Sequence, residues 1–163
     1  MKHFPFLFVV ALILSSCLNG SADYTPEFRF SYFTTQTGDT LAVRYDEAQE
    51  LNYLDTIHLG DTVNFTVLFD AYGNTLTAAK YAWDSDMAKL EVTFDSTLVK
   101  LLATGSDTAK GNLLFSEAQD LRAVVLPMHY VPLKQGSTNM RFQIESNSKF
   151  SPNNLSLTFP VRE

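Results

Sequence analysis

Cysteine is almost absent from this sequence: its 163 residues include one, Cys17. A single cysteine excludes an intramolecular disulfide and a zinc site built from several thiolates. Basic residues are also scarce, with 12 Lys plus Arg against 18 Asp plus Glu and a formal net charge of −6. An acidic chain without a basic run does not suit nucleic acid, whose phosphates need cationic partners. We therefore expect no nucleic-acid partner.

The apolar run near the N-terminus is too short for a membrane-spanning helix, which needs about 20 apolar residues. It extends from Phe6 to Leu14, follows Lys2, and ends in Leu14-Ser15-Ser16-Cys17. A basic residue, a short apolar stretch and small residues before a cut are the parts of a secretory signal peptide. The last four residues resemble the lipobox of bacterial lipoproteins. This resemblance implies that residues 1–16 are removed and that Cys17 carries the lipid.

Two alternatives to this interpretation are an ordinary signal peptide with a chance cysteine and an N-terminal membrane anchor. On the lipoprotein interpretation, residues 17–26 form a short polar tether and residues 27–163 form a single domain. The length of that domain is sufficient to bury a core without disulfides. We therefore expect one folded unit attached to a membrane through its N-terminal lipid.

The domain is dominated by apolar residues that alternate with polar ones, which is the period of a strand with one buried face. The clearest strand follows Gly60-Asp61, and we expect its Val63, Phe65, Val67 and Phe69 face to be buried beside Phe142 and Phe159. Similar alternation marks Phe28 to Tyr32, Leu41 to Tyr45, Ala79 to Trp83, Leu90 to Phe94, Met140 to Ile144 and Leu155 to Val161.

Helical periodicity is missing from every segment of ten or more residues, and Leu98 to Leu102 is interpreted as an irregular apolar stretch. Pro127 and Pro132 favour an edge or irregular strand for the β-prone segment 123–130, because proline cannot donate to a strand ladder. Short strands with turns every 8–12 residues are typical of a sandwich. We predict an all-β, immunoglobulin-like antiparallel β-sandwich of seven to nine strands.

Three features resemble the small immunoglobulin-like lipoproteins of Bacteroidota. They are the lipobox, the segment Leu59-Gly60-Asp61-Thr62-Val63-Asn64-Phe65-Thr66-Val67, and Ser151-Pro152-Asn153 before the closing strand. The resemblance implies a fold and an envelope location but brings no functional residues. Leu18 is not the aspartate that signals inner-membrane retention, which favours the outer membrane. Lipoproteins of this group that are displayed on the cell surface resemble one another in having acidic residues soon after the cysteine. Here Asp23 is the only acidic residue near Cys17, and this favours the periplasmic face over the cell surface.

Motifs for catalysis, metals and cofactors are missing from the sequence. His58 and His129 have no second ligand at metal spacing, and no serine lies in Gly-x-Ser-x-Gly. We therefore predict a non-enzymatic interaction or structural module of the cell envelope, with no metal or cofactor and with an envelope protein or a glycan as partner. The alternatives are a carbohydrate-binding accessory lipoprotein and a small secreted hydrolase.

Three tyrosines fall outside the alternating core positions: Tyr24, Tyr53 and Tyr72. Tyrosine combines a flat apolar ring with a polar tip and is common on contact surfaces. These residues are our candidate contact surface, with ordinary loop tyrosines as the alternative. In a glycan-binding protein we expect exposed, coplanar aromatic rings in a groove, whereas a flat apolar patch would favour a protein partner.

Five triplets of Asp, then Ser or Thr, then a small apolar residue or Thr resemble the O-glycan acceptors of exported Bacteroidota proteins. The acceptor residues would be Thr40, Thr56, Thr62, Ser96 and Thr108. The alternative is that Asp-Thr pairs recur because they suit the turn before a strand. Thr108 lies in a polar loop, so we expect it to be the best exposed acceptor.

Overall fold

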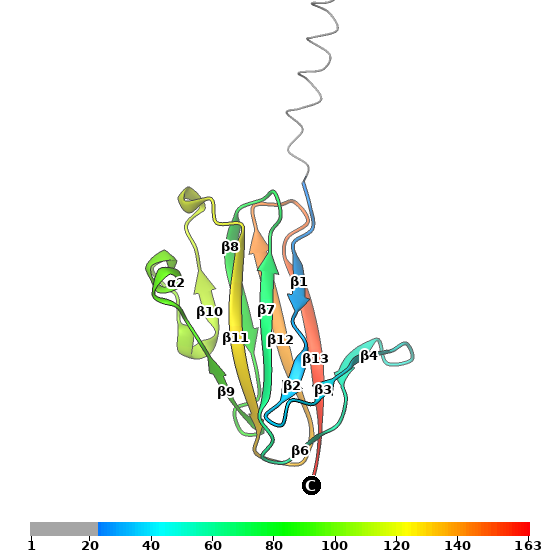
Figure 1. Cartoon of the computed structure of the whole chain (residues 1–163). Helices are drawn as coiled ribbons and strands as arrows, with labels where there is room; N and C mark the ends of the chain where they lie inside the picture. The colour runs from blue at the N-terminus through cyan, green and yellow to red at the C-terminus, as the bar shows by residue number, and fades with distance from the viewer. Residues whose placement is uncertain (1–22) are drawn as a thin grey trace, which may run out of the picture.

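The computed structural model describes residues 23–163, and the predicted signal peptide and Cys17 lie outside the described residues. From Asp23 to Glu163 the chain forms thirteen strands in two sheets that pack face to face (Figure 1). Nine of these strands have four or more residues, and the other four have two or three. The prediction of an all-β, immunoglobulin-like sandwich is therefore confirmed.

Sheet A lies in front in Figure 1, in the order β3-β2-β7-β11-β9. β1 also pairs with β7, beside the shorter contact that β2 makes with the same strand. All of its pairs are antiparallel. Its strands are β1 (Glu27–Phe30), β2 (Phe33–Thr35), β3 (Thr40–Leu41), β7 (Val63–Asp70), β9 (Ala88–Val92) and β11 (Ala123–Pro132).

Sheet B lies behind sheet A, in the order β10-β8-β12-β13-β5-β4. β13 pairs in parallel with β5 and with β6, and the other pairs are antiparallel. Its strands are β4 (Val43–Asp46), β5 (Leu51–Leu54), β6 (Ile57–His58), β8 (Leu76–Ala82), β10 (Asn112–Leu114), β12 (Gly136–Ser146) and β13 (Asn153–Arg162).

The core between the sheets contains the aromatic rings that the alternation predicted. Val63, Phe65, Val67 and Phe69 are all buried on β7. The Phe65 ring lies 6.3 Å from the Phe159 ring, and the Phe69 ring lies 6.4 Å from the Phe142 ring. The predicted register of β7 is therefore confirmed, and each buried phenylalanine removes a large apolar area from water.

One predicted irregular segment is a helix: α2 (Ser96–Leu101) replaces the stretch expected from Leu98 to Leu102. Its N-cap is Asp95, whose carboxylate accepts hydrogen bonds from the backbone N–H groups of Thr97 and Leu98. This satisfies donors that a helix start leaves without partners. Six residues are too few to show a helical period, so this helix escaped the prediction. Two 3₁₀ turns follow, η1 (Thr108–Lys110) and η2 (Glu117–Gln119).

The prediction of an edge or irregular strand at 123–130 is wrong, because β11 is a continuous strand that lies between β7 and β9. Pro127 is accommodated at the end of the β9 ladder, which covers Met128–Pro132 on β11. The Pro127 carbonyl accepts from Thr93 N–H on the β9 side. The proline nitrogen points to the same side as its carbonyl, toward β9 and away from β7. The missing N–H therefore costs the β7 ladder no hydrogen bond, and the pair with Thr93 keeps the one bond that Pro127 accepts.

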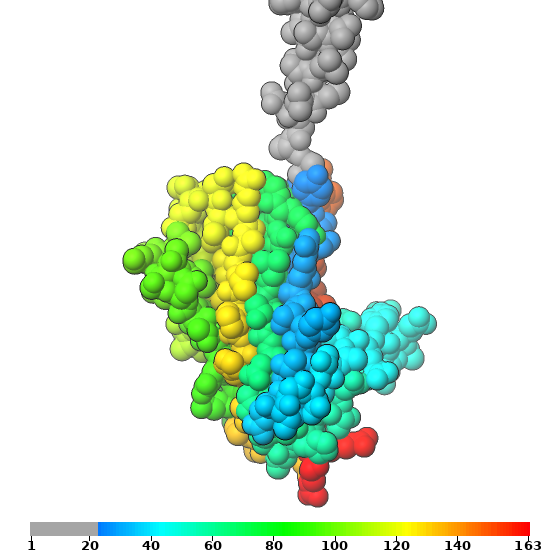
Figure 2. Space-filling view, in the orientation of Figure 1, coloured from blue at the N-terminus to red at the C-terminus, as the bar shows by residue number. Residues whose placement is uncertain are grey.

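Two segments whose apolar residues alternate with polar ones do not bury those apolar residues as predicted. Val43 and Tyr45 are 46% and 57% exposed on β4, and Tyr32 is 82% exposed between β1 and β2. β4 pairs with β5 alone and projects from the side of the sandwich in Figure 2, where no opposite sheet covers it. Within residues 23–163, no helix has the length and apolar character needed to span a membrane.

Candidate functional site

The outer face of sheet B carries polar side chains in register across four strands. Asn112, Lys80, Gln143 and Asn154 are successive cross-strand partners on β10, β8, β12 and β13. Directly paired residues point to the same face of a sheet, so these four side chains form one polar row. The row places one ammonium group and three amides on the outer face of the sheet.

The adjacent row places a large cation between two small residues. Arg141 on β12 pairs with Ala82 on β8 and with Ser156 on β13. A methyl group and a hydroxymethyl group leave space on both sides of the guanidinium. This local choice of small residues hollows the face around Arg141.

Two adjoining hollows result, and we call them together the sheet B groove. The larger has a volume of about 690 Å³ and the smaller about 410 Å³, and both are lined by Ala82 and Arg141. The larger hollow is lined by Lys80, Tyr81, Ala82, Lys110, Gly111, Asn112, Arg141, Phe142, Gln143, Asn154, Leu155 and Ser156. The smaller is lined by Ala82, Trp83, Asp84, Ser137, Thr138, Asn139 and Arg141.

One wall of the larger hollow is the turn η1 and the glycine that follows it. Gly111 has a φ of +68°, and a Cβ there would lie 2.1 Å from the carbonyl oxygen of Tyr81, so only glycine fits. The Tyr81 hydroxyl donates to the Thr108 carbonyl at 3.1 Å and holds η1 against β8. Burial raises the pKa of Tyr81 to about 12, so this hydroxyl keeps its proton at physiological pH.

The cations around the groove differ in their partners. Lys80 forms an ion pair with Glu145, which also accepts from the Gln143 amide at 3.0 Å. Lys110 pairs with Asp107 at 3.2 Å, and its hydrogen bond lowers the pKa of the Asp107 carboxyl. Arg141 has no ion-pair partner among the residues of the described chain. Its guanidinium is therefore available to an anionic ligand.

Several buried polar atoms around the groove lack a hydrogen-bond partner within residues 23–163. They include Asn112 Oδ1 at the larger hollow and both Trp83 Nε1 and Thr138 Oγ1 at the smaller one. Asn112 shares the outer face with Lys80, whereas Thr138 pairs with the buried Phe159 and Trp83 stacks on the buried Tyr81. A polar ligand in the groove therefore suits Asn112, and ordered water suits the two atoms on the core side. Among these residues Thr138 is 4% exposed, which makes its unmet hydroxyl costly.

Behind Thr138 lies the buried hydroxyl of Tyr130, which also lacks a partner among the described residues. Burial raises the pKa of Tyr130 to about 12. A contact with the Thr138 hydroxyl opposes part of this rise in pKa. Tyr130 lines neither hollow, so this hydroxyl belongs to the core and not to the groove.

The predicted tyrosine surface is brought together only in part. The rings of Tyr24 and Tyr72 lie 5.8 Å apart, and the Tyr72 hydroxyl contacts both Glu27 and Arg29. Tyr53 is half-buried on β5, in the hairpin with β4 that projects elsewhere on the molecule. The hydrogen bond that the Arg29 guanidinium donates to the Tyr72 hydroxyl raises the pKa of Arg29. Tyr24 and Tyr72 thus form one surface, which does not include Tyr53.

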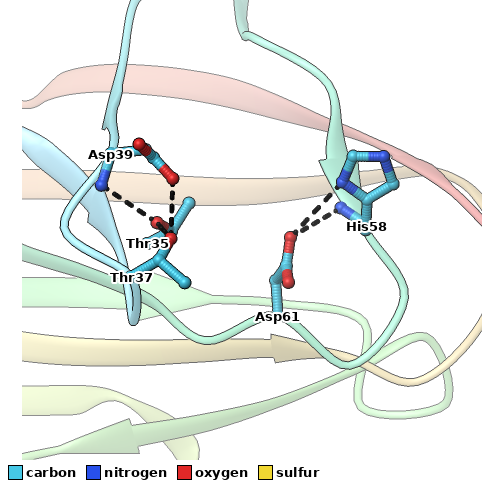
Figure 3. A network of polar contacts seen from close by, with 5 residues as sticks. All are labelled: Thr35, Thr37, Asp39, His58 and Asp61. Carbon is cyan, nitrogen blue, oxygen red and sulfur yellow. Dashed lines mark hydrogen bonds and ion pairs between the residues drawn. The ribbon is translucent and has the colours of Figure 1, made fainter.

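The five predicted glycan acceptors lie at separate places. Thr40, Thr56, Ser96 and Thr108 are exposed, and Thr62 is half-buried. In each triplet the preceding aspartate binds neighbouring groups of its own structure. Figure 3 shows two of these aspartates: Asp39 accepts from the Thr37 hydroxyl at 2.6 Å, and Asp61 accepts from the His58 N–H at 3.0 Å.

The other three aspartates cap or pair in the same way. Asp95 and Asp107 cap α2 and η1, and Asp55 binds Arg44 at 2.7 Å and accepts from Ala42 N–H at 2.9 Å. The hydrogen bond from Arg44 lowers the pKa of Asp55. Local turn and cap chemistry therefore accounts for the recurrence of Asp-Thr pairs, and occupancy of the acceptors stays a prediction.

Neither histidine of residues 23–163 belongs to a metal site. No group of three or more His, Cys, Asp or Glu side chains is placed to hold a metal ion in this part of the chain. His129 Nδ1 lies 2.5 Å from Asn64 Oδ1 on the outer face of sheet A, and His58 Nδ1 lies 3.6 Å from Asp61 Oδ2 (Figure 3). Both histidines thus have neighbours within the fold.

Sequence reasoning missed every residue of the sheet B groove. The polar positions of β8, β12 and β13 were assigned to solvent, which is correct, but their alignment depends on pairing between distant segments. A usable signal was present in the small residues Ala82 and Ser156 at solvent-facing positions of otherwise regular strands. Small outward residues beside an arginine indicate a hollow where longer side chains would fill the space.

No protein-family model matches this sequence, and no curated protein matches it. Distant structural similarities exist, all at 14% sequence identity. The secreted serine protease VesC from Vibrio cholerae aligns over 74% of this chain and 23% of its own, with a TM-score of 0.40. A chain described as BspA_C_WT aligns over 85% and 51%, with a TM-score of 0.44. A family 123 glycoside hydrolase from Clostridium perfringens aligns over 85% and 28%, with a TM-score of 0.35.

The present chain spans about half or less of the length of these three proteins. Similarities at this level identify no family and carry no argument about activity or ligand. The candidate site therefore stands on its own residues and geometry.

Proposed function

We propose that this protein is a lipid-anchored, non-enzymatic binding module of the bacterial cell envelope, and that the sheet B groove binds an acidic glycan. The observation that carries the ligand proposal is Arg141, a cation without an ion-pair partner among the described residues, which lies between two hollows. Such a guanidinium suits a carboxylate, which it can bind through two parallel hydrogen bonds.

The groove offers a glycan acid polar contacts and not the exposed aromatic rings expected above, because the rings of Tyr81 and Phe142 at the larger hollow are buried. The row of Asn112, Gln143 and Asn154 offers amide donors and acceptors of the kind that hydroxyl groups need. Lys80 and Lys110 are paired with Glu145 and Asp107, so the charge that the groove offers to a ligand is that of Arg141. An anionic group on the ligand would pair with this guanidinium.

Binding is favoured over hydrolysis by the residues of the larger hollow. Its lining, all within residues 23–163, includes no aspartate, glutamate or histidine. General acid–base chemistry on a glycan normally uses a pair of carboxyl groups. The smaller hollow has one carboxylate, Asp84, which accepts from Asp86 N–H at 3.0 Å.

The anchor proposal rests on the sequence, because Cys17 lies outside the described residues. The lipobox-like Leu14-Ser15-Ser16-Cys17 follows a short apolar run and supports attachment by acyl chains, since two or more chains hold a protein stably on a membrane. We place the protein on the outer membrane, with the periplasmic face preferred over the cell surface.

Metabolic labelling tests the anchor. The full chain is expressed in a host of its own phylum with labelled palmitate, beside the variant Cys17→Ser. We expect the native chain to incorporate label and the variant to lose it. Label retained by Cys17→Ser would overturn the proposal.

Calorimetric titration tests the groove, with oligogalacturonate as the acidic probe and maltooligosaccharide as the neutral one. We expect binding of the acidic probe alone. Arg141→Ala should weaken it by about 10–100-fold, which corresponds to the loss of a charged hydrogen bond. Arg162→Ala, which removes the same charge from an exposed site on β13, is the matched control and should change little. Equal binding of both probes, or unchanged binding by Arg141→Ala, would contradict the proposal.

A further inference from the structure

The end of the sandwich where the described chain begins exposes two aromatic rings. Tyr24 is 50% exposed and packs against Tyr72, and Phe150 is 49% exposed in the turn between β12 and β13. The Lys149 ammonium lies 4.9 Å from the centre of the Phe150 ring. Figure 1 places this end opposite the C-terminus. We call Tyr24, Tyr72, Lys149 and Phe150 the aromatic end.

The N-terminal segment is fixed to this end before β1 begins. The Asn74 amide donates to the Tyr24 carbonyl at 3.2 Å, and the Asn153 amide donates to the Pro26 carbonyl at 2.8 Å. Asp23 accepts from the Lys149 N–H at 3.3 Å and lies 3.8 Å from its ammonium. Residues 23–26, which were grouped with the tether, therefore lie against the domain.

The remaining connection to Cys17 is short. Six residue steps separate Cys17 from Asp23, and a fully extended chain covers about 3.5 Å per step, or about 20 Å in total. If Cys17 carries acyl chains, the aromatic end cannot lie farther than this from the lipid to which they belong. The opposite end of the sandwich cannot take its place without lifting the fixed segment.

We propose that the aromatic end sits in the headgroup layer of the membrane that holds the Cys17 lipid. Tyr24 and Phe150 contact the apolar boundary. The Lys149 ammonium, which lies over the Phe150 ring and 3.8 Å from the Asp23 carboxylate, turns from these groups to lipid phosphates. Rings with polar tips and long basic side chains are the residues that suit such an interface. The proposal rests on the anchor proposed above, and it fixes the orientation of the domain: the long axis of the sandwich stands away from the membrane.

This orientation has a consequence for the sheet B groove. The groove lies on the side of the sandwich, on the outer faces of β8, β12 and β13, and not at the aromatic end. A domain seated by its aromatic end therefore keeps Arg141 open to a ligand beside the membrane. Seating by the sheet B face would cover it.

A fluorescent probe on a single introduced cysteine tests the proposal. Once Cys17 is lipidated no free thiol remains, because the sequence has no other cysteine. Gly73→Cys places the probe at the aromatic end, in the exposed turn beside Tyr72, and Leu133→Cys places it at the opposite end, where Leu133 is 51% exposed. The lipidated chains are reconstituted in phosphatidylcholine vesicles with or without a lipid that carries a nitroxide quencher on its headgroup.

We expect the nitroxide lipid to remove most of the emission at position 73 and little at position 133. The double change Tyr24→Ser with Phe150→Ser should bring quenching at position 73 down to the level at position 133, because a tether alone does not hold the end in the headgroups. The intact mass of each chain shows whether Cys17 carries its lipid. A chain without lipid would contradict the proposed anchor, and it would not test the proposed contact between the aromatic end and the headgroups.

Two results would overturn the seating. Quenching at position 73 that stays unchanged in the double-serine chain would show that the aromatic rings do not hold the end. If the nitroxide lipid does not quench the probe at position 73 of a lipidated chain, the aromatic end does not contact the headgroups. Another occupant, such as a second copy of the chain or a protein partner, would then cover this surface.

Discussion

The hydroxyl of Tyr81 on β8 donates to the backbone carbonyl of Thr108 at 3.1 Å and joins the sheet to one wall of the groove. The two residues come from segments that are separated by α2. Because the same hydroxyl is buried, its pKa is raised to about 12. The same hydroxyl thus holds the wall of the groove in place and makes the free energy of unfolding depend on pH in the alkaline range.

We predict a pH-dependent loss of stability that the two buried tyrosines share. Unfolding lowers the pKa of each from about 12 to the ordinary value of about 10, so their contribution is complete below pH 10 and is lost as pH rises toward 12. Tyr81→Phe and Tyr130→Phe should each make the alkaline decline shallower. Urea unfolding from pH 8 to 12 measures this, and a decline that neither variant alters would contradict the prediction.

At neutral pH the same two variants should differ. Tyr81→Phe removes a hydrogen bond and should lower the free energy of unfolding by about 1 kcal/mol. Tyr130→Phe removes a buried hydroxyl that has no partner in the described chain, so it should change stability little or increase it.

Gly111→Ala should destabilise the protein strongly, because the new methyl group meets backbone as well as an unfavourable φ. We expect a loss of at least about 2–3 kcal/mol from strain and displacement of η1. Gly38→Ala is the matched control: its φ is +91° but nothing lies within 4 Å of the added carbon, so about 1–2 kcal/mol is expected. Thermal melting compares them, and equal melting temperatures would rule out the close approach at Gly111.

Phe65→Ala should cost about 3–5 kcal/mol, because it leaves a cavity between the sheets beside Phe33 and Phe159. Thr66→Ala, one residue along the same strand and on the outer face, should stay within about 0.5 kcal/mol of the native chain. Denaturant unfolding measures both values. Similar small losses at the two positions would mean that the register of β7 is wrong.

The inward face of the sheets could be predicted because apolar alternation is local. Four successive alternate positions on β7 suffice to place its core face. The sheet B groove could not be predicted in this way, because Lys80, Gln143 and Asn154 become a row only through the pairing of β8, β12 and β13. The register between β8 and β12, whose paired residues Lys80 and Gln143 are more than 60 residues apart, depends on the packing of the whole core, which a local period does not contain.

The edge prediction for β11 failed for a related reason. Proline removes a donor, and the consequence depends on which neighbour that donor would have faced. The sequence around Pro127 does not reveal that β9 begins its regular pairing one residue later, at Met128. The exposed Tyr45 shows the same limit, because alternation persists on a projecting hairpin that has no sheet opposite it.

The last prediction concerns O-glycosylation of the protein in its native host. Thr108 is exposed as the first residue of η1, and the Asp107 carboxylate beside it is held by Lys110. A glycan there would project from the turn that walls the groove and would add a bulky hydrated group at its rim. We expect the intact mass of the native-host protein to exceed that of polypeptide plus lipid.

Two variants assign any such increment to its residue. Thr108→Ala should remove one glycan mass, because its hydroxyl is open to an enzyme on the folded domain. Thr62→Ala should remove none, because Thr62 is half-buried directly before β7 and Asp61 is engaged by His58. If intact mass matches lipid and polypeptide alone, the acceptors are unoccupied, and the aspartates of the five triplets serve only as the turn and cap residues that their hydrogen bonds make them.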